Sequence, residues 1–401
     1  MEKVKTLIVG GGTAGLFLAA AMKTENVRIV EKGERLGKKL SATGNGQGNL
    51  TNEGVSASRY FNVGARTSAL SLALERYGKD SLCAFMNELG AIVLSDGRGR
   101  YYPTGKQASA ITDLLRYRLE KKGVSVQTGG VVTRLKKQGV GFIATVKTPS
   151  GEEELYAENV VLAVGGKAAK NFGTDGSAYA LARSFGHTVT ELYPSLVQLK
   201  TDVAPIKTLR GIRVDAAVTA YDGKGNRLGT ERGDVIFTEY GVSGDAIFRL
   251  SAFVADKLEQ GVTLSLAFLP DVDGETLLSA LRIKQTDSAI PESELLCGIL
   301  NNQVGRAVLK SRKNGSLEST VSAMKDFRLT VKGSLGFDYA QVTKGGVPLD
   351  EVTEELESKY AKGLYFAGEV LDVDGECGGF NLQWAYSSAR VVAAAIDHKE
   401  A

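Results

Sequence analysis

Cysteine and histidine are scarce in this chain of 401 residues, and their scarcity excludes several kinds of catalytic site. The three cysteines, Cys83, Cys297 and Cys377, are widely separated and form no C-x-x-C pair, so disulfide-reductase chemistry is excluded. Their number and spacing instead indicate a reduced, cytoplasmic protein. The two histidines, His187 and His398, cannot assemble a metal site with these cysteines at any recognised spacing. We therefore expect no metal, and we expect His187 to be structural.

A strong net charge and long apolar runs are also missing. The 49 Lys and Arg nearly balance the 46 Asp and Glu, giving a formal charge of +3, and the basic residues are dispersed. We therefore expect no nucleic-acid partner. The apolar segment near the amino terminus is broken by Gly10, Gly11, Gly12 and Gly15, which argues against a signal peptide, and no other run approaches the ~20 residues that span a bilayer. The sequence predicts a globular protein with a small-molecule substrate and no membrane partner; its oligomeric state is left open.

Glycine, by contrast, is abundant, and the most informative glycines lie in residues 7–16, LIVGGGTAGL. Gly10, Gly12 and Gly15 stand in G-x-G-x-x-G register directly after an apolar run typical of a buried strand. The first glycine permits a tight strand-to-helix turn, the second lets the backbone approach phosphate, and the third lets the helix pack on the sheet. Because the positive end of the helix then faces the anion, the pattern predicts a dinucleotide pyrophosphate site.

The neighbouring residues complete a β-α-β unit, with a strand at 4–9, a helix at 14–23 and a second strand at 27–31. Glu31 ends the second strand, 21 residues beyond Gly10, where a carboxylate can accept hydrogen bonds from ribose hydroxyls. An NADP site would favour an arginine at this position.

The middle of the chain predicts further strands. Short alternating runs predict a small antiparallel meander laid over the parallel sheet, at 124–128, 131–136, 142–147 and 153–157. Residues 159–164 then return to the core through Ala163 and lead into Gly165 and Gly166, where the backbone can approach a ligand closely.

The pattern of apolar and polar residues changes after residue 187. Strand-like runs occur at 212–221, 262–268 and 327–332, and a helical stretch lies at about 274–325. The chain after residue 335 resumes the character of its beginning. We therefore predict a nucleotide-binding domain in two parts, 1–187 and 336–401, and an inserted β-rich domain, 188–335, that carries a helical excursion.

The carboxy-terminal segment predicts a second ligand contact. Residues 363–369, GLYFAGE, read as a strand running into a glycine turn, and a long helix begins near Phe380 after the pair Gly378-Gly379. A helix amino terminus of this kind suits an electron-rich group. In a flavoprotein this group would be the pyrimidine end of the flavin, and the helix would raise the flavin potential.

Six further motifs accompany these features: GKKL at 37–40, TGNGQGNLTN at 43–52, YPTGK at 102–106, GHT at 186–188, FTEYGVSG at 237–244 and QVTKGGV at 341–347. The whole set resembles the two-part FAD fold of glutathione-reductase-like and fumarate-reductase-like flavoproteins. More narrowly, it resembles the BaiN-like family of FAD-dependent oxidoreductases, which includes sequences labelled aminoacetone oxidase. The resemblance covers nearly the whole chain. It implies an α/β fold with a Rossmann-like FAD-binding domain built from both chain ends and an inserted β-rich domain carrying a helical subdomain.

The resemblance also implies which residues contact noncovalently bound FAD. Beside the glycine motif, Glu31, Ala163, Gly165 and Gly166, these are Lys39 near the phosphates, Thr43, Gly44 and Asn49 along the pyrophosphate and ribityl chain, Val132 at the adenine, Gly368 and Glu369 at the ribityl chain, and Gly379, Asn381 and Leu382 at the flavin ring. One departure concerns Gln47 and Gly48, which stand where the family usually has Arg-Cys. Roles that depend on that guanidinium or thiol do not transfer to this chain.

Candidates for acid-base chemistry are few. Tyr240 precedes a tight Gly-Val-Ser-Gly turn, which lacks the G-x-S-x-G spacing of a hydrolase. Tyr240, Tyr102 and Lys106 could supply a proton to a substrate carbonyl or α-carbon, and Cys377 should lie near the flavin. Core packing is the alternative role for the tyrosines, and apolar filling is the alternative role for the cysteine.

The resulting hypothesis is an FAD-dependent oxidoreductase that transfers hydride between flavin N5 and a small organic substrate. No second glycine motif occurs, so NAD(P)H, if it is the donor, must reach the flavin transiently, through a cleft under the inserted domain. Reduction of an activated C=C bond of an oxo-steroid or bile-acid type is the favoured reaction. The alternatives are an amine oxidase of the aminoacetone type that uses oxygen, and a non-enzymatic flavin redox sensor.

Overall fold

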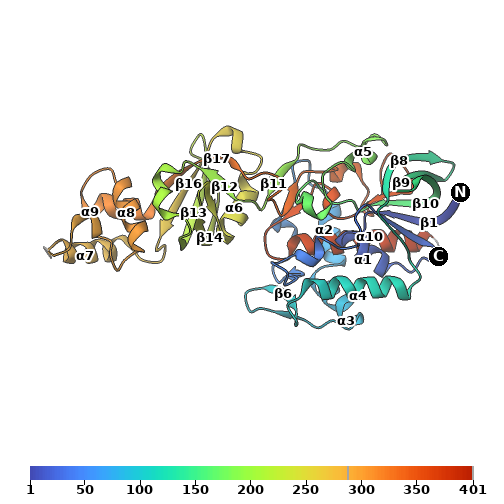
Figure 1. Cartoon of the computed structure of the whole chain (residues 1–401), viewed down its shortest axis with the longest axis horizontal. Coiled ribbons are helices and arrows are strands. Elements are labelled where there is room, and N and C mark those ends of the chain that lie inside the picture. Colours follow the sequence, from blue (N-terminus) through green and yellow to red (C-terminus); the bar gives the residue numbers. More distant parts are fainter. Residues whose placement is uncertain (287–288, 400–401) are drawn as a thin grey trace. The chain divides into compact units, whose positions relative to one another are not determined.

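The computed structural model describes residues 1–286 and 289–399, which form two compact units. The first unit combines Met1–Tyr193 with Val342–Ala401, and the second is Pro194–Gln341. The boundaries predicted from the sequence, 188 and 335, lie a few residues before these. In Figure 1 the first unit is drawn in blue to green and again in red, and the second in light green to orange.

The first unit is built on one seven-stranded sheet with the order β7-β2-β1-β10-β9-β8, in which β19 also pairs with β10. Its strands are β1 (Glu2–Val9), β2 (Val27–Glu31), β7 (Ser125–Thr128), β8 (Val131–Gln138), β9 (Gly141–Thr148), β10 (Gly151–Leu162) and β19 (Leu364–Phe366). The pairs of β1 with β2 and β10, of β2 with β7, and of β10 with β19 are all parallel. These parallel strands place their carboxyl ends, and the loops that follow, along one edge.

The predicted meander is wrong in the region of strand β10. This segment is one continuous strand rather than two, and its first half pairs antiparallel with β9 while its last residues pair with β1 and β19. The change from alternating to continuous hydrophobicity marks the point where the strand enters a sheet covered on both faces, and the backbone does not break there. Residues 125–128 are also outside the meander, because β7 is a parallel edge strand beside β2.

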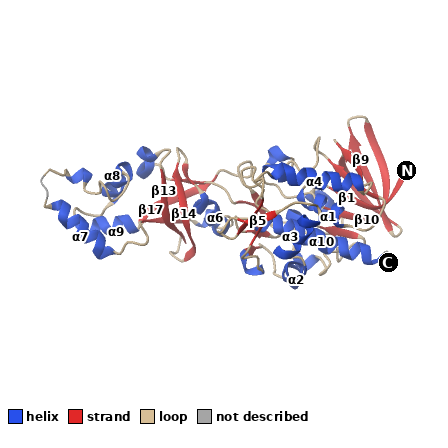
Figure 2. Ribbon diagram, turned by 90° about the horizontal axis from the view of Figure 1, so that it is seen from below, coloured by secondary structure: helices blue, strands red, loops and turns tan. Residues whose placement is uncertain are grey.

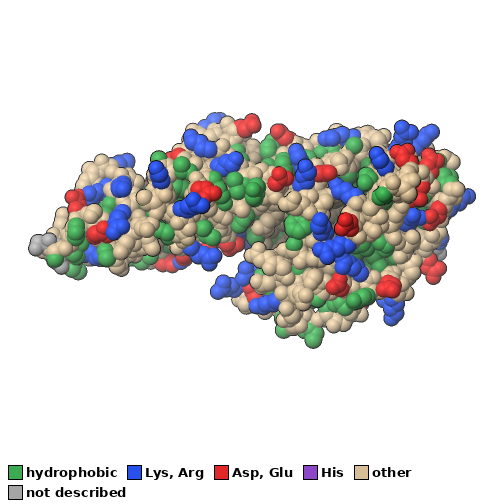
Figure 3. Space-filling model, in the orientation of Figure 1, with side chains coloured by type: hydrophobic (Ala, Val, Ile, Leu, Met, Phe, Trp, Pro, Cys, Tyr) green, Lys and Arg blue, Asp and Glu red, His purple; other side chains and the backbone are tan. Residues whose placement is uncertain are grey.

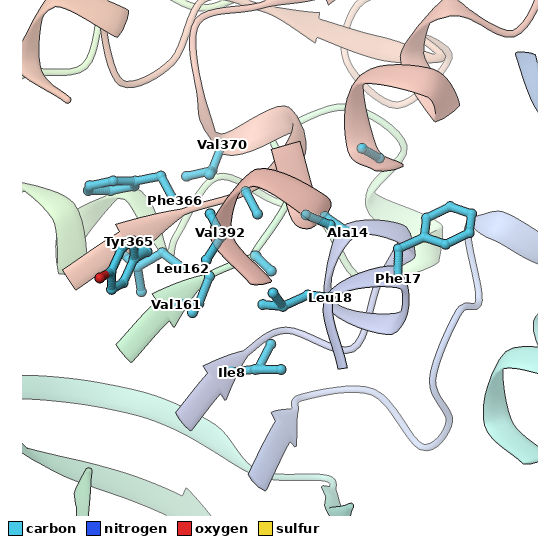
Figure 4. Close-up of a cluster of buried hydrophobic side chains, with 14 of the residues drawn as sticks. Ile8, Ala14, Phe17, Leu18, Val161, Leu162, Tyr365, Phe366, Val370 and Val392 are labelled. Carbon is cyan, nitrogen blue, oxygen red and sulfur yellow. The ribbon is translucent and has the colours of Figure 1, made fainter. Parts of the chain in front are cut away.

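Both ends of the chain contribute to the core of the first unit. Its helices are α1 (Thr13–Ala21), α2 (Ser68–Arg76), α3 (Lys79–Glu88), α4 (Ala108–Lys121), α5 (Tyr179–Arg183) and α10 (Phe380–Lys399), and α1 packs against α10. Figure 4 shows Leu18 of α1, Leu162 of β10, Phe366 of β19 and Val392 of α10 in one cluster, and all four side chains are fully buried. Each such side chain contributes about 1.5–3 kcal/mol relative to exposure. Residues more than 340 positions apart in the chain therefore share a single core.

Short strands of the first unit border its loops. They are β3 (Thr51–Asn52), β5 (Val93–Ser95) and β6 (Arg100–Pro103) in one small sheet, β4 (Tyr60–Phe61) and β20 (Asp374–Gly375) in another, and β18 (Val342–Lys344), while β11 (Tyr193–Ser195) crosses the unit boundary.

The second unit is a closed six-stranded barrel with a helical excursion (Figure 2). The barrel order is β12-β15-β14-β13-β16-β17, formed by β12 (Leu199–Thr201), β13 (Arg213–Asp222), β14 (Arg227–Phe237), β15 (Gly241–Ser243), β16 (Val262–Phe268) and β17 (Phe327–Ser334). Helix α6 (Asp245–Val254) packs on the barrel, and α7 (Gly274–Gln285), α8 (Asn302–Ser311) and α9 (Leu317–Lys325) lie between β16 and β17 in the chain. The unit has its own core, which includes Phe237, Phe268 and Phe327.

In neither unit does the described part of the chain contain a helix with the length and hydropathy that crossing a membrane requires.

Candidate functional site

The three glycines of the first turn are required for three different reasons. Gly10 has φ +103°, and a Cβ there would lie 2.5 Å from the carbonyl oxygen of Ala163, so the turn is pressed against the end of β10. A Cβ on Gly15 would lie 2.0 Å from the Gly10 oxygen, so α1 packs directly on the turn. Around Gly12, by contrast, no described atom lies within 4 Å of where a Cβ would be, and Gly12 is the N-cap of α1. The helix therefore presents bare backbone to open space.

Glu31 lies against this turn from the end of β2. Its Oε2 accepts a hydrogen bond from Gly11 N at 2.7 Å, and its Oε1 accepts one from Gly33 N at 2.6 Å. The next loop is tied to the same place, because Gly130 N donates to Glu31 O at 3.1 Å. That loop leads into β8, where Val132 is buried. The glycine turn, the Glu31 carboxylate and Val132 therefore follow one another in the order in which the phosphates, the ribose and the adenine of a dinucleotide would contact them.

The loop after β2 carries the next set of expected contacts. Thr43 Oγ1 donates to Leu40 O at 2.7 Å, and Gly44 has φ +59° with Asn49 N packed 3.0 Å from its Cβ position. Gly48 has φ +75° and packs on Ala108, the first residue of α4, whose Cα would lie 3.0 Å from a Cβ. This tight loop brings Asn49 inward.

Asn49 provides the test of whether a cofactor fits here. Its side chain is buried, and its Oδ1 accepts no hydrogen bond from any residue in 1–286 or 289–399. A buried polar atom without a partner costs about 1–3 kcal/mol, so native structures rarely leave one. Together with the open backbone at Gly12, this orphan acceptor indicates that a polar ligand completes the site. The residues present therefore fit FAD, whose hydroxyl groups are donors.

Glu369 joins three of the expected segments. Its carboxylate accepts from Lys39 Nζ at 2.8 Å and from Thr343 N at 2.9 Å. A Cβ on Gly166 would lie 2.8 Å from Glu369 Oε1, so the loop after β10 passes directly beside it, and Gly165 in that loop has φ +71°.

Gly368, next to Glu369 in the chain, packs closely against α1 and α10. It has φ +78°, a Cβ on it would meet the Ala14 side chain at 2.7 Å, and its N donates to Ser388 Oγ at 2.9 Å. The carboxy-terminal segment is thus locked between α1 and α10.

The turn before α10 is shaped by Gly379 and Asn381. Gly379 has φ +101°, and a Cβ there would lie 2.5 Å from Thr51 O, so the turn packs on β3. Asn381 accepts from Gly375 N and donates to Gly375 O, both at 2.8 Å, and Leu382 packs against the core. The first N–H groups of this 20-residue helix have no acceptor within the helix, and their contact with the flavin ring is an expectation from the sequence.

The four acid-base candidates fall in different places. Tyr102 lies on β6, with the guanidinium of Arg100 5.9 Å from its ring, and Cys377 is half-buried in the turn before α10. Lys106 is exposed in a loop with φ +45°. Tyr240 belongs to the second unit, in the turn before β15, where its carbonyl accepts from Thr201 N at 3.0 Å. Strand β6, which carries Tyr102, borders the turn that carries Cys377, since Arg100 Cγ lies 4.0 Å from the Cβ position of Gly378.

Sequence reasoning missed two buried charged residues beside this site, Lys344 and Asp372. Lys344 occurs in the QVTKGGV motif, which supports the family resemblance alone, and Asp372 lies between residues 363–369 and the Gly378-Gly379 pair. The available signal was a lysine or an aspartate inside an otherwise apolar and glycine-rich run, a pattern that indicates a buried charge.

His187 is structural, as predicted. It is buried, its Nδ1 lies 3.0 Å from Glu351 and its Nε2 lies 2.6 Å from Ser358 Oγ. Within the described ranges, no cluster of three or more His, Cys, Asp or Glu side chains is arranged to hold a metal ion.

This chain is similar to a known protein family and to individual proteins of known name. The family described as HI0933-like protein Rossmann domain matches residues 4–395. The 3-dehydro-bile acid delta(4,6)-reductase of Clostridium scindens is 37% identical over 400 residues, covering 95% of this chain and 96% of that protein. The ribosomal RNA dihydrouridine synthase of Escherichia coli is 28% identical over 403 residues, covering 97% of each chain.

Solved structures show the same fold. The 3-ketosteroid-delta4-(5alpha)-dehydrogenase of Rhodococcus jostii matches with a TM-score of 0.53 at 16% identity, covering 99% of this chain and 97% of that one. A flavocytochrome c3 fumarate reductase matches with a TM-score of 0.50 at 17% identity, covering 99% of this chain and 78% of that one. The predicted fold class, a Rossmann-type nucleotide-binding fold built from both chain ends with an inserted β-rich domain, is confirmed.

Proposed function

This chain belongs to the HI0933-like, or BaiN-like, family and is an FAD-dependent oxidoreductase; from that premise we propose that it reduces a C=C bond conjugated to a carbonyl group in a small steroid-like molecule. NADH or NADPH is the proposed electron donor. The observation that carries the proposal is the 37% identity to a bile-acid delta(4,6)-reductase over almost the full length of both proteins.

The two relatives also share a reaction although their substrates differ. A delta(4,6)-reductase saturates double bonds of a steroid that carries a 3-oxo group. A dihydrouridine synthase saturates the ring double bond of uracil, which is conjugated to a ring carbonyl. In both cases the double bond that is reduced is conjugated to a carbonyl group, which makes it an acceptor for hydride. This shared reaction supports double-bond reduction over amine oxidation.

The charge distribution supports a small substrate over RNA. Residues 194–341 contain equal numbers of Lys plus Arg and of Asp plus Glu. Many of these charges are paired, including Arg210 with Glu239 at 2.5 Å and Arg306 with Glu294 at 2.6 Å. On the face shown in Figure 3, basic and acidic side chains are interspersed over this unit. Binding to a phosphate backbone depends on unbalanced positive charge, and the second unit lacks it.

Catalysis requires that a proton reach the substrate α-carbon as the hydride reaches the β-carbon. Bound FAD supplies the hydride from N5. We propose that the proton comes from one of the sequence candidates Tyr102, Tyr240, Lys106 and Cys377. Tyr102 and Cys377 border the turn before α10, where the flavin ring is expected, so Tyr102→Phe is the first variant to examine.

Anaerobic stopped-flow spectroscopy of the purified flavoprotein tests the proposal. We expect NADH or NADPH to bleach the visible flavin band, and a 3-oxo steroid with conjugated double bonds to restore it. The matched control is the saturated 3-oxo steroid, which should leave the flavin reduced. If neither nucleotide bleaches the flavin while aminoacetone does, the protein is an amine oxidase. If uridine in a ribosomal RNA fragment restores the band and the steroid does not, the substrate assignment is wrong. Reduction with no turnover of any acceptor would favour the sensor hypothesis.

A further inference from the structure

A lysine and an aspartate are buried together in the first unit, next to the residues expected to contact FAD. Lys344, on β18, is 6% exposed, and its Nζ lies 5.2 Å from the centre of the Phe61 ring. Asp372 is 1% exposed, and its carboxylate accepts from Val63 N at 2.9 Å and from Gly64 N at 2.6 Å. Burial raises the pKa of Asp372, while those two hydrogen bonds and the charge of Lys344 act in the opposite direction.

The backbone places this pair beside the cofactor contacts. Residues 343–347 run along residues 369–372: Thr343 N donates to Glu369 at 2.9 Å, Val347 N donates to Val370 O at 2.9 Å, and Asp372 N donates to Val347 O at 2.8 Å. Lys344 therefore lies between a contact to Glu369 and a contact to Asp372.

The same backbone continues to the flavin end of the site. After Asp372 the chain enters β20, which lies against β18, and Gly375 at the end of β20 is held by the side chain of Asn381. A further buried carboxylate, Asp374, is part of β20. Asp372 thus lies on the stretch of chain that connects the expected ribityl contact to the expected contacts of the flavin ring, and Lys344 lies on the segment that runs beside that stretch.

We propose that the buried charge of Lys344 raises the reduction potential of bound FAD and that Asp372 limits this effect. Reduction adds negative charge to the pyrimidine part of the flavin, and a nearby cation in a low-dielectric interior favours that change. The carboxylate opposes it. The inference rests on the flavin site, which the proposed function shares, and is independent of the substrate.

The test is the reduction potential of the FAD-loaded protein, measured by equilibration with a redox dye. We expect Lys344→Met to lower the potential and Asp372→Asn to raise it, each by at least a tenfold change in the two-electron equilibrium, which is ~30 mV. Lys344→Arg keeps the charge and should leave the potential near the wild-type value. Opposite shifts identify a charge effect, because general loosening of the site would move both variants in the same direction.

Lys122→Met is the matched control. Lys122 is a half-buried lysine that donates to Ala19 O at 3.0 Å, at the carboxyl end of α1 and away from the turn at Gly12. Its replacement should leave the potential unchanged.

Shifts of the same sign in Lys344→Met and Asp372→Asn, or no shift in either, would overturn the inference. If Lys344→Met cannot be purified with FAD, Asp372→Asn decides, because a fall or no change in its potential contradicts the proposal. If the two variants shift the potential in opposite directions and the protein does not reduce a conjugated steroid, the proposed function is contradicted and this inference is not.

Discussion

At the residue scale, the glycines of the first turn differ in what surrounds them, and this difference separates FAD binding from folding. Gly12 has φ −74° and ψ −165°, which alanine adopts, and its Cβ position is open. Gly15 has the Gly10 oxygen 2.0 Å from its Cβ position.

We therefore expect Gly12→Ala to fold normally and to bind FAD at least tenfold more weakly, because the methyl group enters the space that faces the pyrophosphate. Gly15→Ala should lose about 1–3 kcal/mol of stability or more, because α1 must move off the turn. Urea unfolding of the apoproteins and fluorescence titration with FAD measure the two effects. Unchanged FAD affinity in Gly12→Ala would show that the cofactor does not occupy this space.

His187 carries a second prediction at this scale. Ser358 Oγ already accepts from Tyr360 N at 3.1 Å and from Ala361 N at 3.0 Å, so its proton is available for His187 Nε2. Nδ1–H then donates to Glu351, and the ring is neutral. Burial lowers the pKa of His187, and Glu351 acts in the opposite direction with a smaller effect.

Because the folded pKa lies below the unfolded value of about 6.5, the unfolded state takes up a proton first on acidification. The contribution of His187 to stability is therefore complete above that value and is lost as the pH falls toward the folded pKa, at up to about 1.4 kcal/mol per pH unit. Urea unfolding at several pH values between neutrality and mild acidity should show a shallower pH dependence in His187→Gln than in the wild type. Parallel curves would mean that folding does not shift the pKa of His187.

At the scale of elements, the end of α10 is tied to the end of α1. Asp397 accepts from Lys23 N at 2.9 Å, from Thr24 N at 2.9 Å and from Thr24 Oγ1 at 2.8 Å. These bonds lie at the opposite ends of both helices from the expected FAD contacts.

Asp397→Ala should lower the free energy of unfolding by about 1.5–3 kcal/mol, the range for hydrogen bonds to charged groups, and leave FAD affinity unchanged. Asp397→Asn, which keeps an acceptor, should lose less. Equilibrium urea unfolding and FAD titration of the three proteins provide the measurement. A marked loss of FAD affinity would contradict the separation of the helix ends.

Local signals predicted some elements and not others. The strand at 27–31 and the helix at Phe380 were recovered because glycines and apolar runs mark their ends in the sequence itself. The sequence pattern predicts two strands in place of β10 because the environment of this strand changes along its length, and the sequence does not show which strands are its neighbours in the sheet. Strand β14 and helix α6 were missed, since the polar, glycine-containing run of β14 depends on its barrel partners.

The site shows the same limit. The glycine turn and Glu31 have local signatures, whereas the contribution of Lys344 depends on its distance from Asp372 and Glu369, which only the folded chain defines.

At the scale of the whole molecule, the two units have separate cores. Every residue expected to contact FAD belongs to the first unit. Calorimetry should therefore show two unfolding transitions, of which FAD stabilises one, by about 2.7 kcal/mol at a hundredfold excess over Kd. Gly12→Ala is the control, in which the same FAD concentration should stabilise that transition less, by about 1.4 kcal/mol for a tenfold weaker affinity. A single transition that FAD shifts as a whole would show that the units unfold together.

The shared core of residues near the two ends of the chain bears on how the protein is made. On the ribosome, residues 194–341 emerge before β19 and α10, and their barrel holds all its own partners. The first unit must wait for synthesis of residues 364–399, although β1 is translated before the barrel. The middle of the nascent polypeptide should thus fold ahead of its beginning, and the coenzyme should be acquired only after translation has passed the final helix.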